Sequence, residues 1–194
     1  MLPSSFLHLP IAHRALHDRA AGRVENSRAA IRAAIDAGYG IEIDVQVSAD
    51  GVAMVFHDET LYLPTSDTGY VRARDCAALG AIRLTDANEG IPTLAEVMDI
   101  VAGRVPLLVE IKDQSHALGL VDGALERAVA ADLADYEGPV AVMSFNPESI
   151  AVMAQVAPEI PRGLTTCAFV DEVAMHLPKE RRAAVWAEFW ERRD

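Results

Sequence analysis

Cysteines, long apolar runs and clusters of positive charge are all scarce in this sequence. Only two cysteines occur among its 194 residues, Cys76 and Cys167, and neither belongs to a paired motif. A disulfide framework and a zinc cluster are therefore not expected. No apolar run approaches the roughly 20 residues of a membrane-spanning helix, and the stretch before Ile11 is too short and too poor in Lys and Arg for a secretory signal. We expect a cytoplasmic protein without stable membrane insertion.

The charge balance also restricts the partners that this protein can bind. The formal net charge is −12 and no Lys/Arg-rich run occurs, which argues against DNA, RNA or anionic lipid as a partner because these need clustered positive charge. A small anionic substrate stays compatible with the sequence if a bound cation and a few bases reverse the field inside one cleft. Nothing in the sequence indicates an oligomeric state.

Short apolar runs alternate with segments of helical period, which is typical of βα units around a parallel sheet. We expect one domain over residues 1–194, with a small insertion around 59–90. The predicted strands are Leu9–His13, Gly40–Val47, Val52–Phe56, Val105–Ile111, Val140–Phe145 and Arg162–Thr166, and the predicted helices cover 27–37, 73–79, 94–101, 118–133, 147–156 and 181–193. A closed TIM barrel needs eight strands. The sequence therefore predicts an α/β fold, a TIM (β/α)8 barrel that lacks its last one or two βα units.

Three acidic residues stand on two of these strands. Glu42 and Asp44 are two residues apart on one strand and share a face, and Glu110 lies near the end of another strand. Polar residues at the C-terminal ends of parallel strands point into the mouth of such a barrel. Carboxylate oxygens suit a hard divalent cation such as Mg²⁺ or Ca²⁺ rather than zinc. A single strand carboxylate is more often structural, but three at strand ends predict a metal site.

Basic side chains and histidines stand at the ends of three predicted strands, 9–13, 52–56 and 105–111. His13 and His57 would supply a general acid and a general base on opposite sides of a reacting phosphorus. Arg14 offers a bidentate fork to a phosphate, and Lys112 a compact positive charge. Each also has a structural interpretation: either histidine could cap a turn, and Lys112 could form a salt bridge to a neighbouring carboxylate.

Six sequence motifs occur in one order between about Ile11 and about Thr166. They read IAHRALHD with VENS, GYGIEIDVQVSADGVAMVFHDETL, IPTLAEVM, VPLLVEIKD, VMSFNPESI and PRGLTT. In order and spacing this set resembles the glycerophosphodiester phosphodiesterases. The resemblance is specific because the paired HR and EN motifs, the EIDVQ strand and the FHD and EIK strand ends must all occur in sequence.

The resemblance implies a fold, a reaction and a set of site residues. The fold is a TIM barrel of the phospholipase C-like phosphodiesterase type with a small insertion near the active site. The reaction is metal-dependent hydrolysis of a glycerophosphodiester, a small molecule, to glycerol 3-phosphate and an alcohol. By motif, the acid and base pair is His13 and His57, the metal ligands are Glu42, Asp44 and Glu110, and the contacts to phosphate or the metal shell are Arg14, Lys112 and Glu25.

The sequence departs from the family pattern in two places. Ala15 follows the HR pair where the family usually has glycine. The Trp-bearing seventh strand and the Asp-bearing last strand that the family places after a segment like 181–193 are not found in the sequence. We therefore expect the natural enzyme to be longer. Two alternatives stay open: another phosphodiester or phospholipid headgroup hydrolase of the same fold, such as the sphingomyelinase D type, and a catalytically inactive binding domain. Turnover in the presence of metal distinguishes them.

Overall fold

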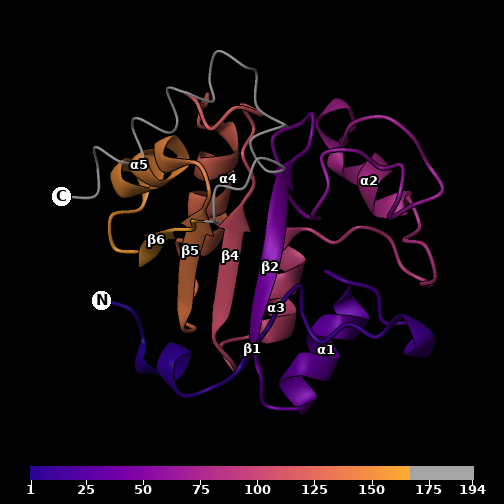
Figure 1. Ribbon diagram of the computed structural model, residues 1–194, viewed down its shortest axis with the longest axis horizontal. Helices are drawn as coiled ribbons and strands as arrows, with labels where there is room; N and C mark the ends of the chain where they lie inside the picture. Colours follow the sequence, from indigo (N-terminus) through magenta and orange to yellow (C-terminus); the bar gives the residue numbers. More distant parts are fainter. Residues whose placement is uncertain (167–194) are drawn as a thin grey trace.

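The computed structural model of the protein describes residues 1–166 (Figure 1). Cys167, His176 and the helix predicted over 181–193 lie outside these residues. Five parallel strands form the sheet in the order β1 (Ile11–Ala12), β2 (Gly40–Val47), β4 (Leu107–Ile111), β5 (Val140–Ser144) and β6 (Arg162–Leu164). β3 (Ala53–Val55) pairs antiparallel with β2, away from this order.

Four helices alternate with the parallel strands, as the sequence pattern predicts. They are α1 (Arg28–Asp36), α3 (Leu94–Val101), α4 (Ala124–Leu133) and α5 (Pro147–Val156), and each packs against the next. The remaining helical elements are α2 (Cys76–Ala81) and the 3-10 turns η1 (Ser4–Leu7), η2 (Arg19–Ala21) and η3 (Val71–Ala73). α2 lies apart from the sheet, at the right of Figure 1. No helix among the described residues is long and apolar enough to cross a membrane.

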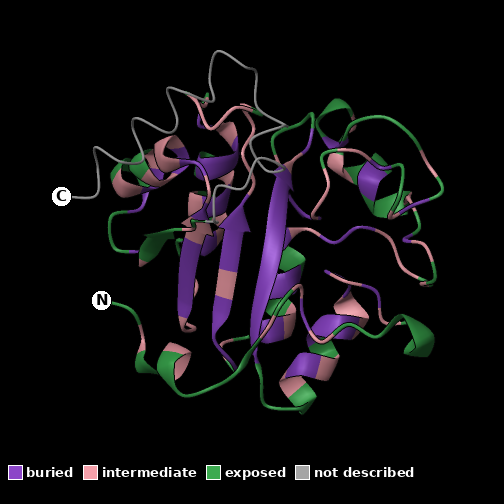
Figure 2. Cartoon of the chain, in the orientation of Figure 1, coloured by how far each residue is buried: buried purple, intermediate pink, exposed green. Residues whose placement is uncertain are grey.

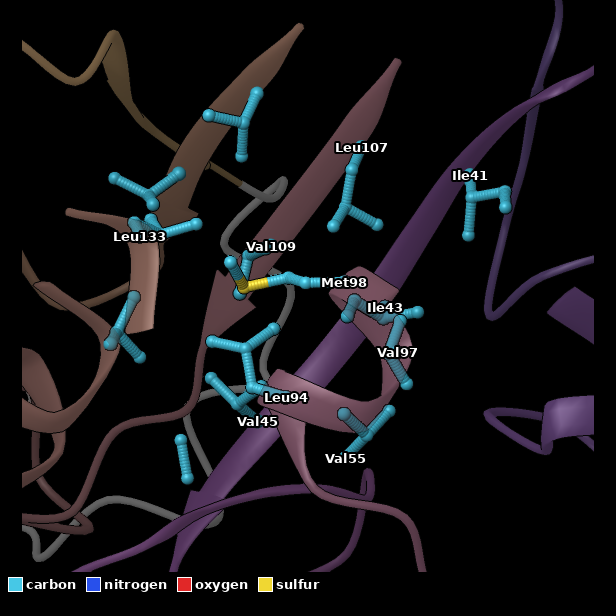
Figure 3. Close-up of a cluster of buried hydrophobic side chains, with 14 of the residues drawn as sticks. Ile41, Ile43, Val45, Val55, Leu94, Val97, Met98, Leu107, Val109 and Leu133 are labelled. Carbon is cyan, nitrogen blue, oxygen red and sulfur yellow. The ribbon is translucent and has the colours of Figure 1, made fainter. Parts of the chain in front are cut away.

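The main core lies between the sheet and these helices. Ile41, Ile43 and Val45 of β2 are fully buried and meet the apolar side of α3, including Leu94 and Val97 (Figure 3). Burying a side chain of this size stabilises the fold by roughly 1.5–3 kcal/mol. β2 and β4 are buried along almost their whole length (Figure 2). Because neighbouring side chains of a strand point to opposite faces, the apolar residues of β2 direct Glu42 and Asp44 to the other face of the sheet.

A second apolar cluster holds the segment 59–90 against the barrel. Met54 and Phe56 from the region of β3 pack with Leu61, Leu79 and Ile91, and all five side chains are buried. This cluster is separate from the main core, so the segment has apolar contacts of its own beside the sheet.

Glu89 links this segment to the start of α1. Its carboxylate accepts hydrogen bonds from the backbone N–H groups of Arg28 (2.9 Å) and Ala29 (3.1 Å), which are unsatisfied donors of the first helical turn. We expect Glu89→Ala to lower the free energy of unfolding by about 1–2 kcal/mol, because two donors lose their acceptor and the helix dipole loses a compensating charge. Urea denaturation measures this change. The control is Glu137→Ala, at an exposed side chain without hydrogen bonds in the described part of the chain; equal midpoints for the two variants would contradict the prediction.

The prediction that Val52–Phe56 continues the parallel series is wrong. β3 runs antiparallel to β2, with Val45 opposite Val55 and Val47 opposite Ala53. The turn between them is tight: Gly51 has φ of 82°, and its N–H donates to the carbonyl of Ser48. A turn of this length can only reverse the chain, because a parallel connection needs a crossover of a dozen or more residues.

The helix predicted over 118–133 is shorter than expected and begins at Ala124. Asp113 holds the preceding residues in a loop by accepting hydrogen bonds from the backbone N–H groups of Ser115 and Leu118. Leu118 and Gly123 have positive φ, at 51° and 75°, and this backbone conformation does not continue a helix. The apolar spacing before Ala124 therefore belongs to a loop at the carboxyl end of β4.

Candidate active site

The three predicted metal ligands lie together on adjacent strands. Glu42 and Asp44 project from β2 and Glu110 from β4, and the parallel register sets Asp44 directly beside Glu110. One carboxylate oxygen from each residue lies within 4.8 Å of the other two, and all three residues are buried. The alternation that places isoleucine and valine in the core thus gathers the carboxylates on the opposite face.

The environment of Glu42 suits a bound cation. Its Oε2 accepts a hydrogen bond from the backbone N–H of Arg14 (2.8 Å), whereas its Oε1 is buried and has no partner among the described residues. A buried carboxylate oxygen without a partner is energetically unfavourable. Burial, with smaller contributions from Asp44 and Glu110, raises the pKa of Glu42 to about 7, against the lowering effects of the Arg14 N–H and Lys112. The residues present therefore fit a hard divalent cation with oxygen ligands.

Two basic side chains lie against the carboxylates. The Lys112 Nζ is 2.7 Å from Glu110 Oε1 and 3.2 Å from Asp44 Oδ1, so the predicted salt bridge is present. The Arg14 Nη1 is 3.0 Å from Glu25 Oε1, and its Nε lies 3.6 Å from Asp44 Oδ2. The structure thus brings Arg14, Lys112 and Glu25 to the edge of the carboxylate cluster.

His57 reaches this site by way of the antiparallel strand. β3 leads the chain back along β2, where the backbone N–H of Phe56 donates to the Asp44 carbonyl (3.0 Å). The next residue is His57, whose Nδ1 lies 2.7 Å from Asp58 Oδ1 and whose carbonyl accepts from Gln46 Nε2 (3.0 Å). The Asp58 carboxylate thus orients the His57 ring, and the Gln46 side-chain amide holds the His57 backbone.

His57 and Asp58 border two cavities. One, of about 390 Å³, is also lined by Glu110, Lys112 and Phe145. The other, of about 460 Å³, is also lined by Arg14 and Glu25 and, from the segment 59–90, by Leu63, Pro64 and Leu84. An imidazole between two cavities can transfer a proton to or from a group bound in either of them.

His13 is the predicted site residue that the structure does not bring into contact with the cluster. It directly follows β1, its side chain is exposed, and it makes no hydrogen bond or ion pair within residues 1–166. Its chain neighbour Arg14 does reach Glu42 through the backbone. The role of His13 stays a prediction.

Sequence reasoning missed two contacts of the site. Asn26 appears in the sequence only as part of the EN motif, but its side-chain amide is hydrogen-bonded to Asp44. The neighbouring Ser27 caps α1 by accepting from the Ala30 N–H. Gln46 donates from its side-chain amide to the His57 carbonyl. It shares a strand face with Glu42 and Asp44, and this alternation is the signal that could have found it.

The sequence matches the glycerophosphoryl diester phosphodiesterase family over residues 13–192. It is 34% identical over 168 residues to a glycerophosphodiester phosphodiesterase of Caldanaerobacter subterraneus, covering 80% of this chain and 67% of that protein. It is 31% identical to the human glycerophosphodiester phosphodiesterase 1, covering 80% of this chain and 48% of that protein. A solved Oleispira antarctica phosphodiesterase in complex with the product sn-glycerol-3-phosphate is 26% identical, with a TM-score of 0.72 and coverage of 89% and 73%.

These relatives confirm the fold class predicted from the sequence. The chain spans about half to two thirds of the length of the curated relatives quoted above. The family match extends over most of the chain and begins at the HR pair, the motif that starts the candidate site. The chain therefore belongs to the glycerophosphoryl diester phosphodiesterase family, a class of phosphodiester hydrolases.

Proposed function

We propose that this site hydrolyses glycerophosphodiesters to glycerol 3-phosphate and an alcohol in the presence of a divalent cation. The observation that carries the proposal is the buried cluster of Glu42, Asp44 and Glu110, in which one Glu42 oxygen lacks any described partner. The product bound to the Oleispira relative is consistent with it.

The cation would be held by these three carboxylates and would supply positive charge that polarises a phosphoryl oxygen. The chain contributes two further positive groups at the same edge. Arg14 has a planar fork suited to two phosphate oxygens, and Lys112 a compact ammonium. Arg14 lies beside Asp44, and Lys112 lies beside Asp44 and Glu110. A phosphate bound to the cation would therefore also meet these two positive groups, despite the net charge of −12.

Proton transfer would fall to His57 and His13. The contact between His57 Nδ1 and Asp58 leaves Nε2 as the nitrogen that exchanges a proton with the substrate, and the Asp58 carboxylate stabilises the imidazolium that forms. The two cavities beside His57 would receive the two sides of the diester. The attacking group is either water or a hydroxyl of the glycerol itself, and His13 would complete the acid and base pair.

The test is the release of glycerol 3-phosphate from glycerophosphocholine and glycerophosphoethanolamine. We expect turnover that EDTA abolishes and that Mg²⁺, Ca²⁺ or Mn²⁺ restores, because the carboxylate cluster would lose and then regain its cation. Glu110→Gln should lower this turnover at least 100-fold, whereas the control Glu137→Gln, at an exposed position, should not. Choline release from sphingomyelin instead would favour the related headgroup hydrolases. Cation binding without release from any diester would favour a binding domain.

A further inference from the structure

The loop between β1 and α1 reaches the carboxylate cluster through Asn26. This residue is buried, and its Nδ2 donates to Asp44 Oδ2 (2.9 Å) while its Oδ1 accepts from the Asp44 backbone N–H (3.2 Å). One side-chain amide therefore contacts both the carboxylate and the backbone of a predicted metal ligand. The two residues are 18 positions apart in the sequence, so this contact arises only in the folded chain.

We propose that Asn26 is a positioning residue that holds the Asp44 carboxylate in the orientation needed to bind the cation. The inference rests on the proposed function, because it takes Asp44 as a metal ligand. Two hydrogen bonds from one planar amide restrict the Asp44 side chain more strongly than a single contact does. Hydrogen-bond partners of metal ligands commonly determine how those ligands are oriented.

The local structure does not by itself require an asparagine amide here. Asn26 has φ of 57°, a left-handed conformation that glycine adopts without strain. Its backbone N–H donates to the Arg14 carbonyl (3.0 Å), a bond that any residue other than proline can make. The helix cap belongs to Ser27. The side-chain amide is thus used for Asp44 alone, among the residues described.

Charge explains why a neutral donor suits this position. Three buried carboxylates repel one another. Lys112 Nζ lies 3.2 Å from Asp44 Oδ1, and Arg14 Nε lies 3.6 Å from Oδ2, the oxygen that Asn26 contacts. A phosphate bound beside the cluster would attract these two cations away from Asp44. An amide has no net charge, so it can hold Asp44 Oδ2 without competing with the divalent cation for the site. Asp44 would then keep its orientation before and after substrate binds.

The experiment compares Mn²⁺ binding by the wild type, Asn26→Gly and Asn26→Ala, measured by isothermal titration calorimetry at pH 8. Asn26→Gly removes both hydrogen bonds and keeps the left-handed backbone favourable. We expect its Mn²⁺ affinity to be about 10- to 100-fold lower. The Mn²⁺ concentration that gives half-maximal release of glycerol 3-phosphate should rise by the same factor, and kcat at saturating Mn²⁺ should change less than tenfold.

The matched control is Ser27→Ala, which removes the adjacent helix cap but no contact to Asp44. It should lower the unfolding temperature and leave Mn²⁺ affinity unchanged, so a general loss of stability is distinguished from a loss of positioning. Unchanged affinity in Asn26→Gly would overturn the inference, and so would unfolding of both Asn26 variants, which would assign Asn26 to the fold. A wild type that binds Mn²⁺ but releases no product would contradict the proposed function alone, and one that binds no Mn²⁺ would overturn both.

Discussion

Glu42→Gln should abolish metal-dependent turnover and at the same time make the metal-free protein more stable. The substitution removes a proposed cation ligand whose Oε1 has no described partner, and it also removes a negative charge that is buried beside Asp44 and Glu110. A glutamine oxygen can still accept from the Arg14 N–H, so the local backbone keeps its contact. Release of glycerol 3-phosphate in the presence of Mg²⁺ measures the first effect, and thermal unfolding in EDTA measures the second.

The stability effect depends on pH with a definite sign. The pKa of Glu42 is raised from 4.5 to about 7 in the folded protein, so between these values the folded state keeps a proton that the unfolded state has released. The stability of the metal-free wild type therefore falls as pH rises through this window and stays low above it, by up to roughly 3 kcal/mol. Glu42→Gln should lack this decline.

Cation binding should show the opposite pH dependence. Below pH 7 a proton competes with the cation for Glu42, so affinity should fall about tenfold for each pH unit lost. The control Glu137→Gln should keep the wild-type pH profile, because that residue is exposed. If metal-free Glu42→Gln were no more stable than the wild type at pH 8, this would contradict the prediction that the buried Glu42 charge destabilises the metal-free protein.

His57→Ala should lower kcat by about 100- to 10,000-fold and leave Mn²⁺ affinity unchanged. The His57 imidazole is the proposed proton-transfer group. His57 is not among the three proposed metal ligands, so its loss should not affect cation binding. Steady-state release of glycerol 3-phosphate at saturating Mn²⁺, together with calorimetric titration, separates this variant from Glu42→Gln, which loses the cation itself.

Asp58→Asn tests the same proton-transfer role with a milder change, because it leaves His57 in place. It keeps a polar group near Nδ1 but removes the carboxylate charge that contacts the ring, so kcat should fall less than in His57→Ala. The control His8→Ala alters an exposed histidine before β1 and should leave kcat unchanged. Full activity of His57→Ala would exclude His57 as acid or base and leave that role to another group.

The alternation of residues along β2 made the carboxylate cluster predictable from the sequence. Isoleucine and valine at every second position require a buried face, and Glu42 and Asp44 must then share the other face. The same local rules predicted helices over 27–37 and 94–101, where α1 and α3 lie. These features depend on neighbours within a few residues, so the sequence contains the information they need.

Other features could not be derived from local pattern. The direction of β3 depends on which strand it pairs with, and its apolar residues suit either direction. Residues before Ala124 have helical spacing, but Asp113 holds them in a loop by hydrogen bonds. The segment 59–90 is joined to α1 through Glu89, 61 positions from Arg28.

The sequence by itself determined the βα pattern, the family motifs and the residue types of the site, because periodicity and motif spacing are local properties of the chain. Only the tertiary structure decided that His57 returns to the cluster along an antiparallel strand, that Glu42 Oε1 lacks a described partner and that Asn26 holds Asp44. Each of these depends on atoms from distant segments that meet after the sheet has formed. Burial and hydrogen-bond partners are therefore set by packing, which residue spacing alone does not specify.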